Sequence, residues 1–176
     1  MQILHLIISL FLSAGNTEPI YNYNILSVSA DTIRLDDYRG KKILLVNIAT
    51  GSSRVGQLQQ LQQLQQQYAS QVRVIAFPSN SFGNEPLADS AIAAFCSSQY
   101  SVTFPVAVKA AVTGNDKQAL YQWLGNAGLN GAYALEPRED FKKYLISSTG
   151  EIVGSFAGEV SPLSDLIVNA ITNPNN

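Results

Sequence analysis

Chemically reactive side chains are scarce in this chain of 176 residues. Its only cysteine is Cys96, so the sequence excludes an intramolecular disulfide, a CxxC motif and a cysteine-based metal site. Its only histidine is His5, inside an apolar run near the N-terminus. A histidine-based triad or zinc site in the rest of the chain is therefore excluded, and we expect neither a cofactor nor a bound metal.

Charge is also sparse, with charged residues making up 14% of the chain and a formal net charge of -2. The few lysines and arginines are scattered, which excludes a basic surface for nucleic acid. Apolar residues make up 46%, and the length suffices for one domain with a sizeable core. These values predict a compact globular domain.

The N-terminal segment Ile3–Leu12 is almost wholly apolar and is followed by Ser13-Ala14-Gly15. It is too short to span a bilayer, which takes about 20 residues. We therefore predict a signal peptide over 1–15, a single domain over 16–176, a secreted or periplasmic location and no membrane span in the mature chain. Because no Lys or Arg precedes the apolar run, a buried N-terminal element of a cytoplasmic protein is the alternative.

The segment Gln57–Gln67 contains eight glutamines, and its leucines decide its interpretation. Leu58, Leu61, Leu64 and Tyr68 recur at spacings of three and four residues, which places them on one face of a helix. The pattern predicts an amphipathic helix over 56–69 with an uncharged polar face.

Other segments alternate between strand and helix patterns. Continuous apolar runs at Lys42–Ala49 and Val72–Phe77 are typical of strands covered on both faces. Hairpins are predicted at both ends, Ile20–Val28 with Thr32–Leu35 and Tyr144–Ser147 with Ile152–Phe156. Further helices are predicted at Ala88–Tyr100, Asp116–Leu124 and Ser161–Ile171, the last with Ser161 as N-cap and Pro162 at its first position. This order predicts an α/β fold of the thioredoxin-like kind, with a central mixed β-sheet flanked by helices and an N-terminal β-hairpin.

Several motifs resemble the glutathione peroxidase family, in the same order and at the same spacings over about residues 20–171. They are Leu35–Tyr38 with Gly40-Lys41, Leu45–Ala49, Phe77–Gly83, Glu85-Pro86, Phe95-Cys96 with Tyr100–Pro105, Leu120–Leu124 and Phe141–Ile146. The resemblance implies a thioredoxin-like fold. It also implies the activity of the family's members, which reduce hydroperoxides with glutathione or thioredoxin in the response to oxidative stress.

The family's catalytic tetrad can be mapped onto this chain through the same motifs. The peroxidatic cysteine or selenocysteine falls on Ser52, and the glutamine falls on Ser81. The tryptophan and asparagine fall on Glu139 and Asp140. All of these positions carry a different residue from the family's.

These replacements remove the expected chemistry, because an alkyl hydroxyl is barely ionised at neutral pH and has no stable counterpart of a sulfenic acid. Ionised Glu139 and Asp140 would add negative charge where the family places neutral donors. We therefore expect an inactive family member with a binding or structural role toward an unidentified protein partner or small ligand. Glutathione or thioredoxin would be partners only of an active protein.

Three alternatives remain open at this point. The chain could be a weak or altered thiol peroxidase acting through Cys96, although a buried structural cysteine is the simpler interpretation and the family's resolving cysteine falls on Ser97. Ser52 could be a hydrolase nucleophile if a base other than histidine lay beside it. Glu136, Glu139 and Asp140 could together bind a divalent cation.

Overall fold

The computed structural model describes residues 17–174, and its centre is a four-stranded sheet in the order β4-β3-β5-β6. The strands are β3 (Lys42–Ile48), β4 (Val72–Pro78), β5 (Lys143–Ile146) and β6 (Ile152–Phe156). β3 pairs with β4 in parallel and with β5 antiparallel, and β5 pairs antiparallel with β6. The sheet is therefore mixed, as the sequence predicts.

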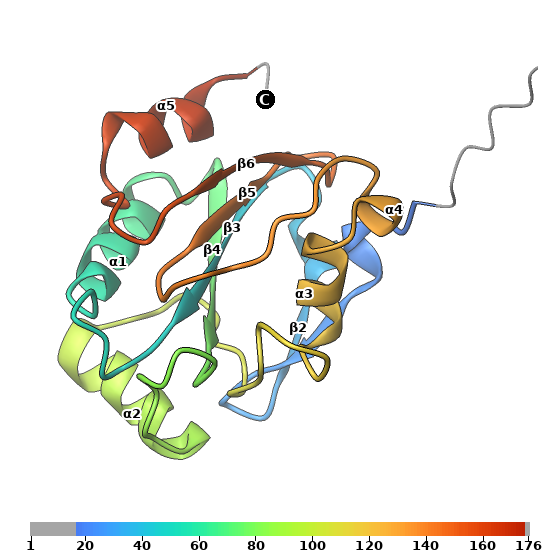
Figure 1. The fold of residues 1–176 in the computed structure, drawn as a ribbon. Helices are drawn as coiled ribbons and strands as arrows, with labels where there is room; N and C mark the ends of the chain where they lie inside the picture. Colours follow the sequence, from blue (N-terminus) through green and yellow to red (C-terminus); the bar gives the residue numbers. More distant parts are fainter. Residues whose placement is uncertain (1–16, 175–176) are drawn as a thin grey trace, which may run out of the picture.

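Every residue of β3 is buried, and alternate side chains enter two separate cores. On one face Leu44 and Val46 pack with α1 (Gln57–Gln67), α2 (Asp89–Tyr100) and α5 (Asp165–Thr172). On the other face Ile43 and Leu45 pack with the N-terminal hairpin and α3 (Ala119–Leu124). Figure 1 shows the same division, with the sheet standing between these two groups of elements. A strand covered on both faces reads as a continuous apolar run, which is why its prediction is correct.

The N-terminal hairpin consists of β1 (Asn24–Leu26) and β2 (Thr32–Arg34), which pair antiparallel. It is shorter than predicted, because Ile20–Asn22 forms a 3-10 turn, η1, ahead of it. A second 3-10 turn, η2 (Leu35–Tyr38), follows it. The predicted signal peptide lies outside the described residues, and none of the helices within 17–174 is long and apolar enough to cross a membrane.

The helices are α1 (Gln57–Gln67), α2 (Asp89–Tyr100), α3 (Ala119–Leu124), α4 (Ala127–Asn130) and α5 (Asp165–Thr172). The prediction of Asp116–Leu124 begins three residues too early, and α4 is missed.

The predicted start of the last helix at Ser161 is wrong, because α5 begins at Asp165 with Ser164 at the N-cap position. Ser161 lies in the preceding turn. Its hydroxyl accepts a hydrogen bond from Leu163 N (3.3 Å) and donates one to Gln60 Oε1 of α1 (2.9 Å). The turn before α5 is thus hydrogen-bonded to α1.

The polar face of α1 is less exposed than its pattern predicts, because Gln62 and Gln65 are buried. Gln65 Oε1 accepts a hydrogen bond from Val74 N of β4 at 2.9 Å. Gln62 Oε1 accepts one from Thr103 N, also at 2.9 Å. Two glutamines therefore tie α1 to the backbone of neighbouring segments.

Candidate functional site

Ser52 lies in the turn that leads from the end of β3 toward α1, and it is only 5% exposed. Its amide donates to Ala49 O at 3.2 Å, and its hydroxyl oxygen accepts a hydrogen bond from Arg54 N at 3.3 Å. No other described residue hydrogen-bonds to this hydroxyl. The position lacks the general base that a serine nucleophile needs, which argues against the hydrolase alternative.

A buried carboxylate, Glu85, holds this turn from the side of the 79–88 loop. It accepts hydrogen bonds from Thr50 N (2.7 Å), Thr50 Oγ1 (2.6 Å) and Leu87 N (3.1 Å). Bonds from N–H and O–H donors satisfy a carboxylate that has no cationic partner, so Glu85 can be buried.

Gly51 lets the two loops approach closely. Its amide donates to Asn84 O at 2.9 Å, and a Cβ at this position would lie 2.8 Å from the same oxygen. Any residue with a side chain would push the loops apart, so the backbone at Ser52 depends on glycine before it.

Glu139 and Asp140 are tied to the loops around Ser52. Glu139 accepts from Arg54 Nη2 at 2.9 Å in an ion pair, and its other oxygen accepts from Gly158 N at 2.8 Å. Asp140 is buried and accepts from Asn84 Nδ2 at 2.6 Å. The negative charge expected at Glu139 is therefore balanced by Arg54.

The cation-site alternative does not fit these contacts. Glu136 pairs with Lys117, Glu139 with Arg54, and Asp140 with Asn84, so the carboxylates turn to different partners. Within residues 17–174 no group of three or more His, Cys, Asp or Glu side chains could hold a metal ion.

Ser81 has its hydrogen bonds elsewhere. Its hydroxyl oxygen accepts from Ser79 Oγ at 3.0 Å and from Val112 N at 3.1 Å, which joins the 79–88 loop to the segment before α3. The contacts of the described residues thus join the Ser52 turn to Glu139 and Asp140, and they direct Ser81 toward the neighbouring loop.

Lys143 of β5 is buried, and the sequence alone does not mark it as a site residue. Its Nζ donates to Phe141 O at 2.9 Å and to Gly158 O at 3.1 Å. Burial, together with the nearby positive charge of Arg54, lowers the pKa of Lys143 to about 7. The signal that could have found it is a lysine directly before the predicted strand Tyr144–Ser147.

Arg54 and Asn84 were missed for a different reason. Each is a polar residue in a turn, where such residues are ordinary, and only the folded chain brings them against Glu139 and Asp140.

Cys96 of α2 is 2% exposed, and no disulfide or other cysteine accompanies it. Burial, with a smaller contribution from the charge of Glu85, raises the pKa of the Cys96 thiol to about 11. Ser97, where the sequence comparison predicts the family's resolving cysteine, is exposed. The predicted burial of Cys96 is confirmed.

The glutathione peroxidase family model matches residues 20–125. The chain belongs to the glutathione peroxidase family. The matched region includes Ser52 and Ser81 and ends before Glu139 and Asp140.

Two curated relatives are similar over most of their length. The glutathione peroxidase homolog BsaA of Halalkalibacterium halodurans is 33% identical over 146 residues, which cover 82% of this chain and 92% of the relative. The glutathione peroxidase-like peroxiredoxin 2 of Saccharomyces cerevisiae is 32% identical, with 84% of this chain and 93% of the relative covered.

Solved structures confirm the predicted thioredoxin-like fold. The apo crystal structure of Trgpx has a TM-score of 0.65 at 29% identity and covers 89% of this chain and 97% of its own. A thioredoxin-family thiol:disulfide interchange protein from Chlorobium tepidum has a TM-score of 0.63 at 15% identity, covering 88% of this chain and 96% of its own. The latter likeness concerns the fold alone.

Proposed function

We propose that this protein is a catalytically silent member of the glutathione peroxidase family that serves a binding or structural role. The observation that carries the proposal is Ser52, which stands where the family has its peroxidatic cysteine or selenocysteine. Its hydroxyl is buried and accepts a hydrogen bond from one backbone amide. Peroxide reduction needs a thiolate or selenolate to attack the O–O bond, and a hydroxyl bound in this way supplies neither.

The other tetrad positions support the same proposal. Glu139 and Asp140 bind Arg54 and Asn84, so they connect loops where the family's residues would face a substrate. Ser81 accepts its hydrogen bonds from Ser79 and Val112. Each replacement thus has a structural use that does not require a peroxide.

The alternative is a weak or altered thiol peroxidase acting in the response to oxidative stress, with glutathione or thioredoxin as its reductant. The curated relatives favour it, because they are named as peroxidases or peroxiredoxins. The burial and raised pKa of the Cys96 thiol oppose it, because little thiolate exists at neutral pH.

We also propose that the protein acts outside the cytoplasm, as a secreted or periplasmic domain. The apolar run Ile3–Leu12 followed by small residues supports this proposal. Sequencing the N-terminus of the protein recovered from its native host tests it. A mature N-terminus near residue 16 supports export, whereas an intact Met1 contradicts it.

Hydroperoxide consumption by the purified protein, with glutathione or thioredoxin as reductant, tests the main proposal. We expect no turnover from the native chain or from Cys96→Ala. Turnover that disappears in Cys96→Ala would overturn the proposal and establish a displaced peroxidatic thiol.

Two further variants show whether the scaffold still supports the family's reaction. Ser52→Cys alone is expected to react with peroxide but to turn over poorly, and adding Ser81→Gln, Glu139→Trp and Asp140→Asn is expected to raise its turnover. Ser53→Cys is the matched control, because Ser53 is the exposed neighbour of Ser52. Equal turnover by Ser52→Cys and Ser53→Cys would mean that a thiol at position 52 gains nothing from its surroundings.

A further inference from the structure

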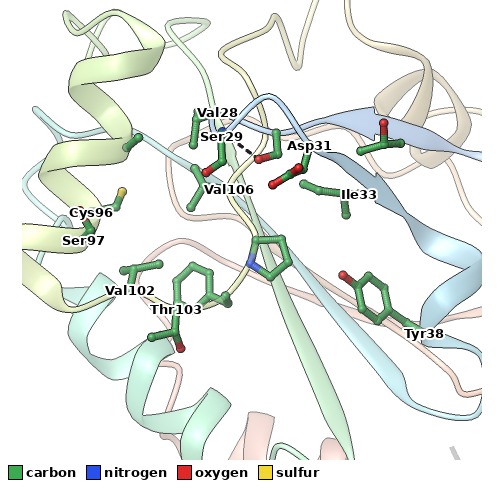
Figure 2. A pocket seen from close by; sticks show the side chains of 15 residues that line it. Val28, Ser29, Asp31, Ile33, Tyr38, Cys96, Ser97, Val102, Thr103 and Val106 are labelled. Atoms are coloured by element: carbon green, nitrogen blue, oxygen red, sulfur yellow. Dashed lines mark hydrogen bonds between the residues drawn. The ribbon is translucent and has the colours of Figure 1, made fainter.

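A pocket of about 390 Å³ lies away from the Ser52 turn, between the β1–β2 hairpin, α2 and the segment 102–106. Figure 2 shows Asp31 and Ser29 on the hairpin turn at one side of it and Cys96 on α2 at another. Its volume lies within the range of sites that take small molecules. Neither the tetrad positions nor Lys143 line it.

Hydrogen bonds fix the walls of this pocket. Val28 N on the hairpin turn donates to Val106 O at 3.0 Å, and Val102 N donates to Cys96 O at the end of α2 at 3.1 Å. Thr103 is bound through its amide and hydroxyl to Gln62 of α1. Because the hairpin, α2 and the segment 102–106 are joined by these contacts, the pocket is formed before any ligand arrives.

The lining has two chemical characters. Apolar surface comes mainly from the segment 102–106, through Val102, Phe104, Pro105 and Val106, with Val28 and Ile33 on the hairpin side. Polar side chains come chiefly from the hairpin and the turn after it, namely Ser27, Ser29, Asp31, Thr32 and Tyr38, and Ser97 and Thr103 add two hydroxyls on the opposite side. A ligand that fits this mixed lining combines an apolar body with a polar end.

Asp31 favours a positively charged group at the polar end of the ligand, because it is the only charged residue among the described residues that line the pocket. Its side chain is exposed, and within 17–174 no hydrogen bond or ion pair engages its carboxylate. Arg73 lies over the ring of Tyr38, 5.2 Å from the ring centroid, and is not part of the lining. The carboxylate is therefore free to receive a cation.

We propose that this pocket binds a small organic cation, an ammonium group carried on an apolar body. The ammonium would donate to the Asp31 carboxylate at the mouth while the body packs against Val102, Phe104 and Pro105. This inference gives a ligand class to the binding role proposed above and rests on it. A failed binding experiment would leave the absence of peroxidase turnover untouched, so the two proposals fail separately.

Calorimetric titration of the whole protein with 2-phenylethylamine, against 2-phenylethanol as its neutral counterpart, tests the charge. We expect the amine to bind about 1.5-fold to fivefold more tightly than the alcohol, the range that an exposed ion pair spans. Asp31→Asn should remove this difference, while Asp116→Asn, at an exposed acid outside the pocket, should keep it. Equal affinity for amine and alcohol, or no binding of the amine, overturns the proposal.

Filling the pocket tests the location. Ala93 lines the pocket from α2, whereas its neighbour Ala94 is exposed and does not. Ala93→Trp should abolish binding of 2-phenylethylamine, and Ala94→Trp should leave it unchanged. Binding that survives Ala93→Trp in a variant with native circular dichroism would place the cation elsewhere and overturn the assignment.

Discussion

Lys143 lies beside Glu139 and Arg54, yet its amine is held by carbonyl oxygens and by no carboxylate oxygen within ion-pair distance. Carbonyl dipoles compensate part of the cost of burying a cation, and the rest appears as a lowered pKa. The residue therefore makes the stability of the fold depend on pH.

Between pH 7 and 8.5 we expect the free energy of unfolding to rise with pH because of Lys143. The unfolded chain keeps this proton up to a pKa near 10.5, whereas the folded chain releases it at about 7, so unfolding takes up protons in this window. The slope would reach at most about 1.4 kcal/mol per pH unit. Urea denaturation of the native protein, Lys143→Met and the neighbouring control Lys142→Met measures it, and an unchanged slope in Lys143→Met would contradict the assignment.

Glu85 supports the Ser52 turn through three hydrogen bonds accepted by its carboxylate. Glu85→Gln replaces one acceptor oxygen with a donor that faces Thr50, so we expect the protein to lose about 1–3 kcal/mol of stability. The exposed Glu159→Gln should change it by less than about 0.5 kcal/mol. Thermal unfolding of both variants checks this, and equal melting temperatures would show that Glu85 does not support the turn.

At the scale of elements, the residue pattern of α1 predicts its apolar face but not which of its glutamines are buried. Its leucine spacing predicts the helix and its buried face correctly. Gln62 and Gln65 are the same residue type as the exposed glutamines of this helix. They are buried because Thr103 and β4 pack against them. Periodicity describes one element, whereas these contacts join two.

The difference between buried and exposed glutamines can be measured within one helix. Gln65→Ala leaves Val74 N without its acceptor and should destabilise the protein by about 1–3 kcal/mol. Gln66→Ala removes an exposed side chain one position along and should cost less than about 0.5 kcal/mol. Equal free energies of unfolding by urea titration would mean that the buried amide adds nothing.

The sequence likewise predicts some residues of the candidate site and not the contacts between them. Ser52 and Ser81 follow from motifs that keep their order along the chain, and β3 and β4 follow from continuous apolar runs. The Arg54–Glu139 ion pair joins residues 85 positions apart, and no local pattern marks either as the partner of the other.

At the scale of the whole molecule, Lys42 connects the start of β3 to the C-terminal helix. Its buried Nζ donates to Ala170 O and Ile171 O, each at 2.9 Å, and to Asn173 O at 2.6 Å. The last carbonyls of a helix have no partners within it, and a cation there also meets the favourable end of the helix dipole. One side chain of the central strand thus fixes the end of α5.

Lys42→Met should therefore loosen α5 more than the sheet. We expect faster amide hydrogen exchange over residues 165–173 and a loss of about 1–3 kcal/mol in global stability. Lys41→Met, whose exposed amine donates to a single carbonyl, is the control. Uniform acceleration of exchange across the sheet and α5 would show that Lys42 acts on the whole fold and does not specifically hold the helix.

The burial of Cys96 affects how strongly the protein resists oxidation. With a thiol pKa of about 11, roughly one molecule in ten thousand carries the thiolate at pH 7. The chain has no second cysteine, and its one methionine is Met1. A scaffold whose relatives are named for consuming peroxide thus offers peroxide little to oxidise. Prolonged exposure should leave its fold unchanged and raise its mass by at most the one oxygen that converts Met1 to its sulfoxide.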